Sequence, residues 1–239
     1  MYYTIHSVIF FIAINTLLFI HSISLEGNLS TKTSSVLTQK DQHMLTPDSV
    51  ISLLKEGNQR FEQGSLTQRN HKEQVRKASL GQHPKAFLLS CVDSRVTIED
   101  IFDQGIGDVF VARIAGNIVN PDILGSMEYG CAVAKSKVVV VVGHEHCGAV
   151  KAAIDKVKLG NLTKLLDKIQ PAIQELADYK GKKNSKNKDF IHEVCIKNIH
   201  LTIQNIREQS PILNKLEQEG EIKIVGALYK MDTGKVIFL

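Results

Sequence analysis

Five consecutive valines, at residues 138–142, constrain the fold of this chain more than any other feature. A short run of β-branched residues without a polar side chain is typical of a buried strand in a parallel sheet. Similar short apolar segments occur at residues 86–90, 108–114 and 221–228, and residues 236–239 can add an edge strand after a turn. The chain is therefore expected to contain a sheet whose central strands are buried.

Helical patterns separate these strands. Thr46 is a suitable N-cap, Pro47 suits the first helical position, and apolar spacing continues to about Gln63. Further helices are expected at residues 71–80, 97–102, 122–135, 147–159, 162–179 and 190–209. Strands that alternate with helices predict an α/β domain with a mostly parallel central sheet flanked by helices.

The N-terminus has a different character. Residues 8–20 are apolar, too short for a comfortable membrane span and suited to the core of a signal peptide, and residues 22–24 offer a small-x-small cleavage site. We expect residues 1–24 to be a signal peptide that exports the protein to the periplasm or the exterior. Because the first 25 residues contain no Lys or Arg, a membrane anchor at residues 8–20 is the main alternative, and a cytoplasmic hydrophobic tail is another.

Residues 25–45 are rich in Ser, Thr, Gln and Lys and lack apolar periodicity, which predicts a disordered tether. Residues 46–239 then form one domain, and no segment within it is long enough to span a bilayer. The net charge of +4 owes much to a lysine cluster at residues 180–188. This cluster has no interleaved aromatic residues, so we expect a solvated loop and no nucleic-acid partner.

Chemically capable residues follow two of the predicted strands. Cys91 follows residues 86–90, and His144 and Cys147 follow the valine run. Open α/β sheets place their active sites at the carboxyl ends of strands. Zinc accepts two thiolates and an imidazole readily, and catalytic zinc keeps a fourth position for water or substrate. These three residues therefore predict a site for one Zn²⁺ per chain.

The four cysteines allow a second interpretation. In an oxidising compartment Cys91 and Cys147 could instead form a disulfide, which predicts no bound zinc. Cys131 and Cys195 lie on apolar helical stripes, where buried free thiols are expected.

Asp93 and Arg95 lie just beyond Cys91. Asp93 can become the fourth zinc ligand, or it can accept the proton of a zinc-bound hydroxide while the Arg95 guanidinium holds it away from the metal. The two arrangements exclude each other. Asp93 and Arg95 are therefore the catalytic candidates, with Asp93 also an alternative ligand. Glu145 and His146 are expected to be a neighbouring pair rather than ligands.

Taken together, these motifs resemble those of the β-class carbonic anhydrases. The resemblance extends from about residue 46 to the C-terminus. It rests on four segments, Cys91-Val92-Asp93-Ser94-Arg95, Val111-Ala112-Arg113-Ile114-Ala115-Gly116-Asn117, Gly125-Ser126-Met127-Glu128-Tyr129 and His144-Glu145-His146-Cys147-Gly148. It implies zinc-dependent reversible hydration of carbon dioxide to bicarbonate and a proton, by attack of zinc-bound hydroxide.

The resemblance also implies residue roles and partners. Cys91, His144 and Cys147 would hold zinc, and Asp93 with Arg95 would form the catalytic dyad. The regions of Gly116 and Gly148 would line the substrate pocket. Family members are dimers or higher assemblies, so a homodimer or homotetramer is expected, with residues 47–63 as an N-terminal helical arm that wraps the partner.

Two positions depart from the family pattern. Some bacterial members bind regulatory bicarbonate through a Trp, an Arg and a Tyr; here Arg113 and Tyr229 match, but Leu88 stands where the Trp would be. Plant-type members place a Gln in the pocket where this chain has Asp103, which makes Asp103 a candidate pocket residue.

Other functions remain open at this stage. Carbonyl sulfide or carbon disulfide hydrolysis could use the same scaffold, and a non-catalytic zinc- or bicarbonate-binding protein would have Asp93 closing the site. The candidates for a proton shuttle are His71, His83 and His146.

Overall fold

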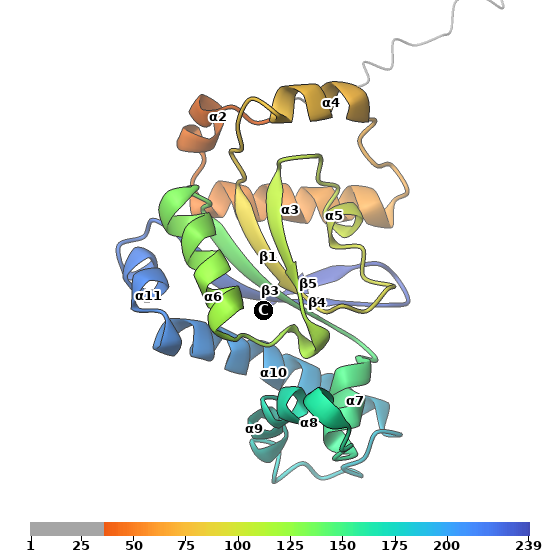
Figure 1. Cartoon of the computed structure of the whole chain (residues 1–239). Coiled ribbons are helices and arrows are strands. Elements are labelled where there is room, and N and C mark those ends of the chain that lie inside the picture. The colour runs from red at the N-terminus through yellow and green to blue at the C-terminus, as the bar shows by residue number, and fades with distance from the viewer. Residues whose placement is uncertain (1–35) are drawn as a thin grey trace, which may run out of the picture. The chain divides into compact units, whose positions relative to one another are not determined.

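A five-stranded sheet forms the centre of the computed structural model, which describes residues 36–239 (Figure 1). The strand order is β2-β1-β3-β4-β5. The first four strands are mutually parallel, and β5 pairs antiparallel with β4. The structure thus confirms the mostly parallel sheet and its edge strand. The strands are β1 (Ala86–Ser90), β2 (Val109–Arg113), β3 (Val138–His144), β4 (Lys223–Tyr229) and β5 (Val236–Phe238).

The valine run forms most of β3, the middle strand of the sheet. Successive side chains of a strand point to opposite faces. Val138, Val140 and Val142 accordingly belong to one core, whereas Val139 and Val141 belong to the other. All five are fully buried. Two-sided burial explains why this strand carries no polar residue before its C-terminal end.

Helices cover both faces of the sheet. On one face lie α3 (Pro47–Glu62) and α5 (Ile98–Ile101), which share a core with alternate residues of β1 and β3. The other face packs against α6 (Pro121–Glu128), α7 (Gly148–Ile154), α10 (Lys188–Gln209) and α11 (Pro211–Gln218). Two further helices, α8 (Gly160–Asp167) and α9 (Gln170–Gln174), lie next to α7 in Figure 1.

The tether prediction is wrong for its last residues. Gln39–Met44 form helix α2, where Thr38 and Asp41 make a reciprocal capping box. Gln42 is buried, and its side-chain amide donates to the carbonyl oxygens of Pro84 and Ala134, at 2.8 and 2.7 Å. Because α2 is held by hydrogen bonds of a polar side chain, its sequence shows no repeat of apolar residues from which the helix could be predicted. The predicted signal peptide and the start of the tether lie outside the described residues.

Helix α3 begins as predicted, with Thr46 as its N-cap and Pro47 in its first turn, and α4 (His71–Ala78) follows. Val50 and Leu54 of α3 are fully buried against the sheet. Asn58 donates to the Ile101 and Gly234 carbonyls and accepts from the Val236 amide, at 3.1, 2.9 and 2.8 Å. The helix is therefore pinned to its own chain. Its contact with a partner subunit stays a prediction.

Two predicted helices differ from those observed. Residues 162–179 form α8 and α9 with a break between them, because Pro171 cannot continue a helix but suits the first turn of a new one. Residues 122–135 leave the α-helix after Glu128 and form a π-helical turn, Tyr129–Val133. Helix α11 was not expected.

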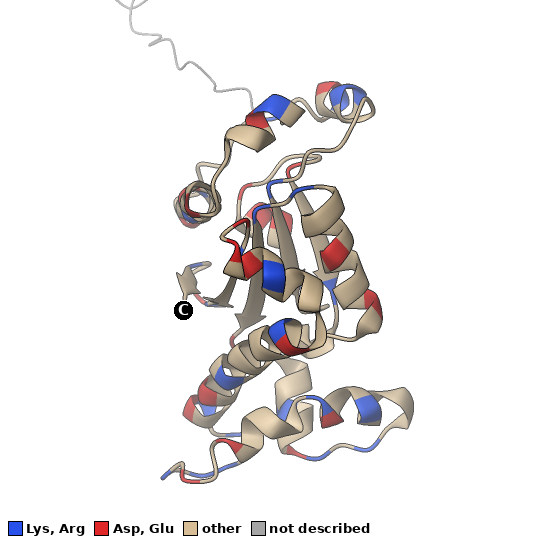
Figure 2. Cartoon of the chain, turned by 90° about the vertical axis from the view of Figure 1, so that its left-hand side faces the viewer, with Lys and Arg blue, Asp and Glu red and all other residues tan. Residues whose placement is uncertain are grey.

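Basic and acidic residues are interspersed on the helices (Figure 2). The five lysines of residues 180–188 are all exposed, around the loop before α10, as expected for a solvated segment. Within residues 36–239 no helix has the length and apolarity needed to cross a bilayer.

Candidate metal centre

Strands β1 and β3 lie side by side in parallel, with Ser90 paired to Val142. Their carboxyl ends therefore meet at one edge of the sheet. The Sγ atoms of Cys91 and Cys147 and a ring nitrogen of His144 lie within 4.8 Å of one another, and all three residues are buried. The structure brings together the three ligands that the sequence predicts.

The donor atoms fit zinc. His144 Nδ1 lies 2.9 Å from the Glu145 carbonyl oxygen, so this nitrogen carries the proton and Nε2 is left with its lone pair. Nε2 is buried and has no hydrogen-bond partner among the described residues. The Cys91 and Cys147 sulfurs are 4.0 Å apart. Two thiolates about 2.3 Å from a tetrahedral zinc would be separated by about 3.8 Å.

The sulfur separation also argues against the disulfide interpretation, because a disulfide bond is only about 2.05 Å long. All four cysteines are free thiols in this structure. Cys131 and Cys195 are buried as predicted, and burial raises the pKa of each to about 12.

The contact between the two cluster thiols shifts their pKa values in opposite directions. The hydrogen bond with Cys147 lowers the pKa of Cys91, assisted by the Gly116 amide, whereas the same bond and burial raise the pKa of Cys147. One thiolate therefore forms readily and the second does not. A bound divalent cation would supply the charge that removes the second proton.

Arg95 holds Asp93 next to this cluster. Its Nε donates to Asp93 Oδ1 at 2.9 Å and its terminal nitrogen donates to Oδ2 at 2.8 Å. These bonds hold the pKa of Asp93 well below its usual range. Asp93 Oδ2 lies 4.0 Å from His144 Nε2. Of the two arrangements that the sequence allows, the structure shows the one in which Arg95 holds the carboxylate.

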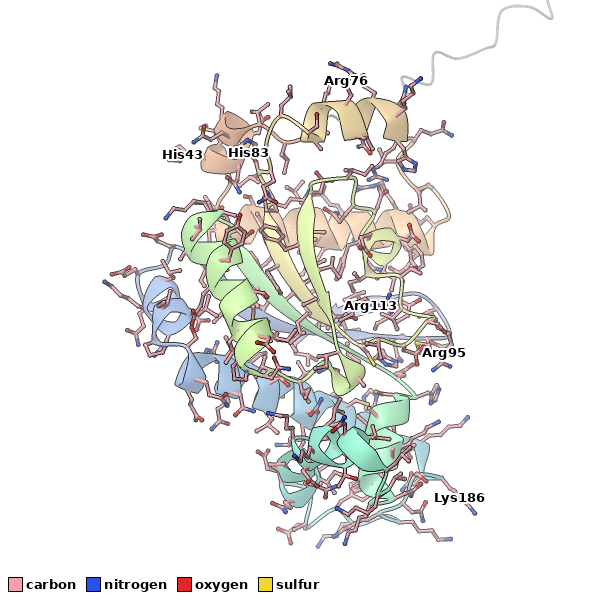
Figure 3. All side chains as sticks on the ribbon, viewed as in Figure 1. His43, Arg76, His83, Arg95, Arg113 and Lys186 are labelled. Carbon is pink, nitrogen blue, oxygen red and sulfur yellow. The ribbon has the colours of Figure 1, made fainter. Side chains whose placement is uncertain are left out.

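Arg113, at the end of β2, supports the same loop. Its Nε donates to the Cys91 carbonyl at 3.0 Å and a terminal nitrogen donates to the Asp93 carbonyl at 2.5 Å. Arg95 and Arg113 are both labelled in Figure 3, where they lie at the same end of the sheet. The sequence interpretation treated Arg113 only as part of a regulatory pattern. Its position at the end of a strand beside β1 is the signal that could have revealed this role.

Gly116 and Gly148 flank the cluster in different ways. Gly116 has a φ of +71° and its amide donates to Cys91 Sγ at 3.4 Å. A Cβ there would lie 2.6 Å from Ile169 Cδ1, so the position has no room for a side chain. Gly148 follows Cys147, and a Cβ there would meet nothing within 4 Å. Their role in lining a substrate pocket stays a prediction.

The structure places Asp103 in an ion-pair cluster with the N-terminal segment. Its carboxylate accepts from Arg60 Nε at 2.5 Å, from an Arg69 terminal nitrogen at 2.5 Å and from Thr67 Oγ1 at 2.6 Å. Burial alone would raise the pKa of Asp103, but these hydrogen bonds outweigh burial and lower the pKa. The carboxylate is thus already engaged, which does not favour the predicted role in the substrate pocket.

The candidate proton shuttles are separated by the fold. His83 precedes β1 whereas Cys91 follows it, so the two lie at opposite ends of that strand, and Figure 3 shows His83 beside α2 and far from Arg95. His146 adjoins the cluster in sequence but is not among its grouped ligands. Glu145 faces elsewhere, with its carboxylate 3.7 Å from His192 Nδ1 and 3.6 Å from Lys230 Nζ. The expectation that Glu145 and His146 are not ligands agrees with this geometry.

Comparison with known proteins assigns the family. The sequence family described as carbonic anhydrase matches residues 86–236. Carbonic anhydrase 2 of Mycobacterium tuberculosis is 33% identical over 197 residues, which are 80% of this chain and 92% of the relative. The chain belongs to the β-carbonic anhydrase family.

Other carbonic anhydrases are similar in sequence or in fold. The carbonic anhydrase of Mycolicibacterium smegmatis is 34% identical over 199 residues, covering 80% of this chain and 92% of the relative. The Coccomyxa β-carbonic anhydrase, solved with acetazolamide, is 26% identical with a TM-score of 0.62, covering 69% of this chain and 75% of that one. This family member is therefore a carbonic anhydrase, and its family supports hydration of carbon dioxide.

Proposed function

We propose that this enzyme hydrates carbon dioxide reversibly to bicarbonate and a proton, and that it uses one Zn²⁺ held by Cys91, His144 and Cys147. The observation that carries the proposal is the buried group of three donor atoms within 4.8 Å of one another, next to a carboxylate held by Arg95. Zinc bound there would supply a Lewis acid that lowers the pKa of a water ligand and makes it a nucleophile.

The protein's own residues orient the reaction. Asp93 is ionised because Arg95 donates to both of its oxygens, so it can accept a hydrogen bond from the nucleophilic oxygen but cannot donate one. Arg113 fixes the backbone between Cys91 and Asp93. Gly148, which follows Cys147, is proposed to line the substrate pocket. Asp93 and Arg95 are therefore proposed as the catalytic pair.

Stopped-flow kinetics test this function directly. The zinc content of the purified protein is measured first, and turnover of carbon dioxide is then compared with turnover of carbonyl sulfide and carbon disulfide. Fast carbon dioxide hydration with about one zinc per chain supports the proposal. Fast carbonyl sulfide hydrolysis with negligible carbon dioxide hydration would show that the protein is a carbonyl sulfide hydrolase. Zinc without turnover of any of the three would indicate a binding protein.

We also propose that the enzyme assembles at least as a homodimer. Strand β2 is at the edge of the sheet, and its residue Phe110 lines a pocket together with Pro121 and Tyr129. Exposed strand edges are usually covered in stable proteins. Light scattering coupled to gel filtration measures the mass, for which two or four times the mass of one chain is expected, 26.6 kDa per chain where the leader is retained. A monomer at micromolar concentration would contradict this proposal.

Export remains a further proposal, based on the apolar residues 8–20 and the small residues at 22–24. Expression of the full chain in a bacterial host with a periplasm, followed by mass spectrometry of the soluble periplasmic fraction, tests it. A mature chain that begins near residue 25 supports cleavage. Recovery of the intact chain in the membrane fraction would favour the anchor.

A further inference from the structure

Helix α10 packs closely against the end of β3 that carries His144. Ile199 of α10 is fully buried, and a Cβ at Gly143 or at Gly226 would each lie 2.7 Å from its side chain. The two glycines therefore let α10 approach β3 and β4 more closely than other residues would permit. This close approach sets the position of the helix along the sheet and hence of the residues next to Ile199.

One face of α10 is polar where it meets the metal centre. His192, Cys195 and Asn198 are three residues apart, so they share a face of the helix. Two of them contact the cluster loops directly. His192 Nδ1 lies 3.7 Å from the Glu145 carboxylate, and Asn198 Nδ2 donates to the Gly116 carbonyl.

Asn198 makes the most direct of these contacts. It is 1% exposed, and its Nδ2 donates to the Gly116 carbonyl oxygen at 2.7 Å. The amide of the same glycine donates to Cys91 Sγ at 3.4 Å. Asn198 is thus joined to the Cys91 sulfur through a single residue. That residue has a left-handed backbone and no Cβ to restrict it, so its backbone is intrinsically free to reorient and the Asn198 bond can restrain it.

An asparagine at position 198 is unfavourable for the stability of this core. Its Oδ1 is buried without a hydrogen-bond partner among the described residues. An unpaired buried polar atom destabilises a fold, and an apolar residue of similar size would avoid it. An asparagine here is therefore explained by its bond to the Gly116 carbonyl, which an apolar residue would leave without this donor.

We propose that Asn198 is a positioning residue of the metal centre: its bond to the Gly116 carbonyl restrains the backbone of Gly116, whose amide then directs the Cys91 sulfur toward zinc. The inference rests on the proposed function, because it concerns the zinc that Cys91 is proposed to bind. Groups that orient metal ligands typically change metal affinity or activity by about 10- to 100-fold when they are removed.

The test removes the hydrogen-bond donor of Asn198 and keeps the approximate size of its side chain. Asn198→Leu is compared with two control variants on the same helix, Thr202→Val and Ile206→Val, whose parent side chains are buried but make none of the contacts above. Zinc dissociation constants are measured by chelator competition, melting temperatures by calorimetry, and the ligand geometry by the thiolate-to-cobalt charge-transfer band of the Co²⁺ form. Asn198→Leu is expected to bind zinc at least about 10-fold more weakly and to shift the band, whereas the controls keep wild-type affinity and band position even where they lower the melting temperature.

A second measurement needs no variant. In ¹¹³Cd-substituted wild-type protein, an amide that donates to a cadmium-bound sulfur shows a scalar coupling to the metal, and this coupling is expected for Gly116. Its absence would overturn the proposal even if Asn198→Leu fails to fold. Wild-type zinc affinity and an unshifted cobalt band in Asn198→Leu would also overturn it and reduce Asn198 to a packing role. A wild-type chain that binds no zinc is a different result, since it overturns the proposed function itself.

Discussion

Arg95 donates to both carboxylate oxygens of Asp93, through Nε at 2.9 Å and through a terminal nitrogen at 2.8 Å. Such a bidentate pair sets the plane of the carboxylate as well as its charge. It keeps Asp93 ionised and holds it beside His144 while the Asp93 carbonyl is fixed by Arg113. The role of Asp93 is thus decided by two arginines from different parts of the chain.

Asp93→Asn is expected to keep zinc and to lose at least about 100-fold in carbon dioxide hydration, because an amide cannot replace the ionised acceptor. Stopped-flow rates and zinc content measured on the same sample separate the two properties. Asp100→Asn, at an exposed acidic residue nearby in sequence, is the control and should match wild type. Full activity in Asp93→Asn would remove Asp93 from the mechanism.

Cys147→Ser is expected to lose zinc, because a serine hydroxyl does not replace a thiolate ligand. Stability should fall with it, since binding free energy of a metal contributes to folding. Metal analysis and thermal unfolding measure the two effects. Cys131→Ala removes another buried thiol and serves as the control, which is expected to keep zinc even if its melting temperature falls. Equal zinc content in Cys147→Ser and wild type would exclude Cys147 as a ligand.

Asp103→Asn is expected to destabilise the fold by about 3 kcal/mol, because it leaves Arg60 and Arg69 without their buried counter-charge. The folded-state pKa of Asp103 is lowered. The ionised carboxylate therefore contributes stability above the unfolded pKa of about 3.9, and this contribution is lost as the pH falls through the folded value. Urea unfolding at pH 7 and below pH 4 should show a difference from wild type that shrinks in acid. A higher KM with unchanged stability would instead support the pocket role.

Carbon dioxide hydration is expected to increase toward alkaline pH. Two thiolates cancel the formal charge of zinc, so the metal should acidify water less than a site of three neutral imidazoles. In carbonic anhydrases of that three-histidine type the zinc-bound water has a pKa of about 7. Rates measured across mildly acidic to alkaline pH in matched ionic strength test this expectation. A profile already flat by mildly acidic pH would contradict the argument.

Local patterns predicted most of the sheet. The valine run and residues 86–90 were correctly predicted as buried strands because two-sided burial excludes polar residues from them. Parallel strands place their carboxyl ends together, so the meeting of Cys91 with His144 and Cys147 also followed from the pattern. Thr46 and Pro47 predicted the start of α3, because these residue types favour the N-cap and the first turn of a helix.

Other features had no local signature. Gln42 anchors α2 through hydrogen bonds to backbone carbonyls 42 and 92 residues away. The spacing of apolar residues cannot predict such bonds, so the helix was missed. Asp103 was predicted by resemblance to be a pocket residue, but in the structure it is bound by arginines 43 and 34 residues earlier. Asn198 looked like an ordinary polar residue of a long helix, since its partner Gly116 is 82 residues away.

The sequence by itself determined the strand pattern and the two strand ends that carry cysteine and histidine residues suited to zinc. It could do so because burial and ligand chemistry can be predicted from residue types and short sequence spacings. Only the tertiary structure decided that Arg95 holds Asp93 off the cluster, that Arg113 braces their loop and that Asn198 bonds to Gly116. The choice between the two arrangements of Asp93 and Arg95 depends on how their loop lies against the cluster, and the Arg113 and Asn198 bonds join residues 20 and 82 positions apart, so all three exist only once the sheet and its helices have packed.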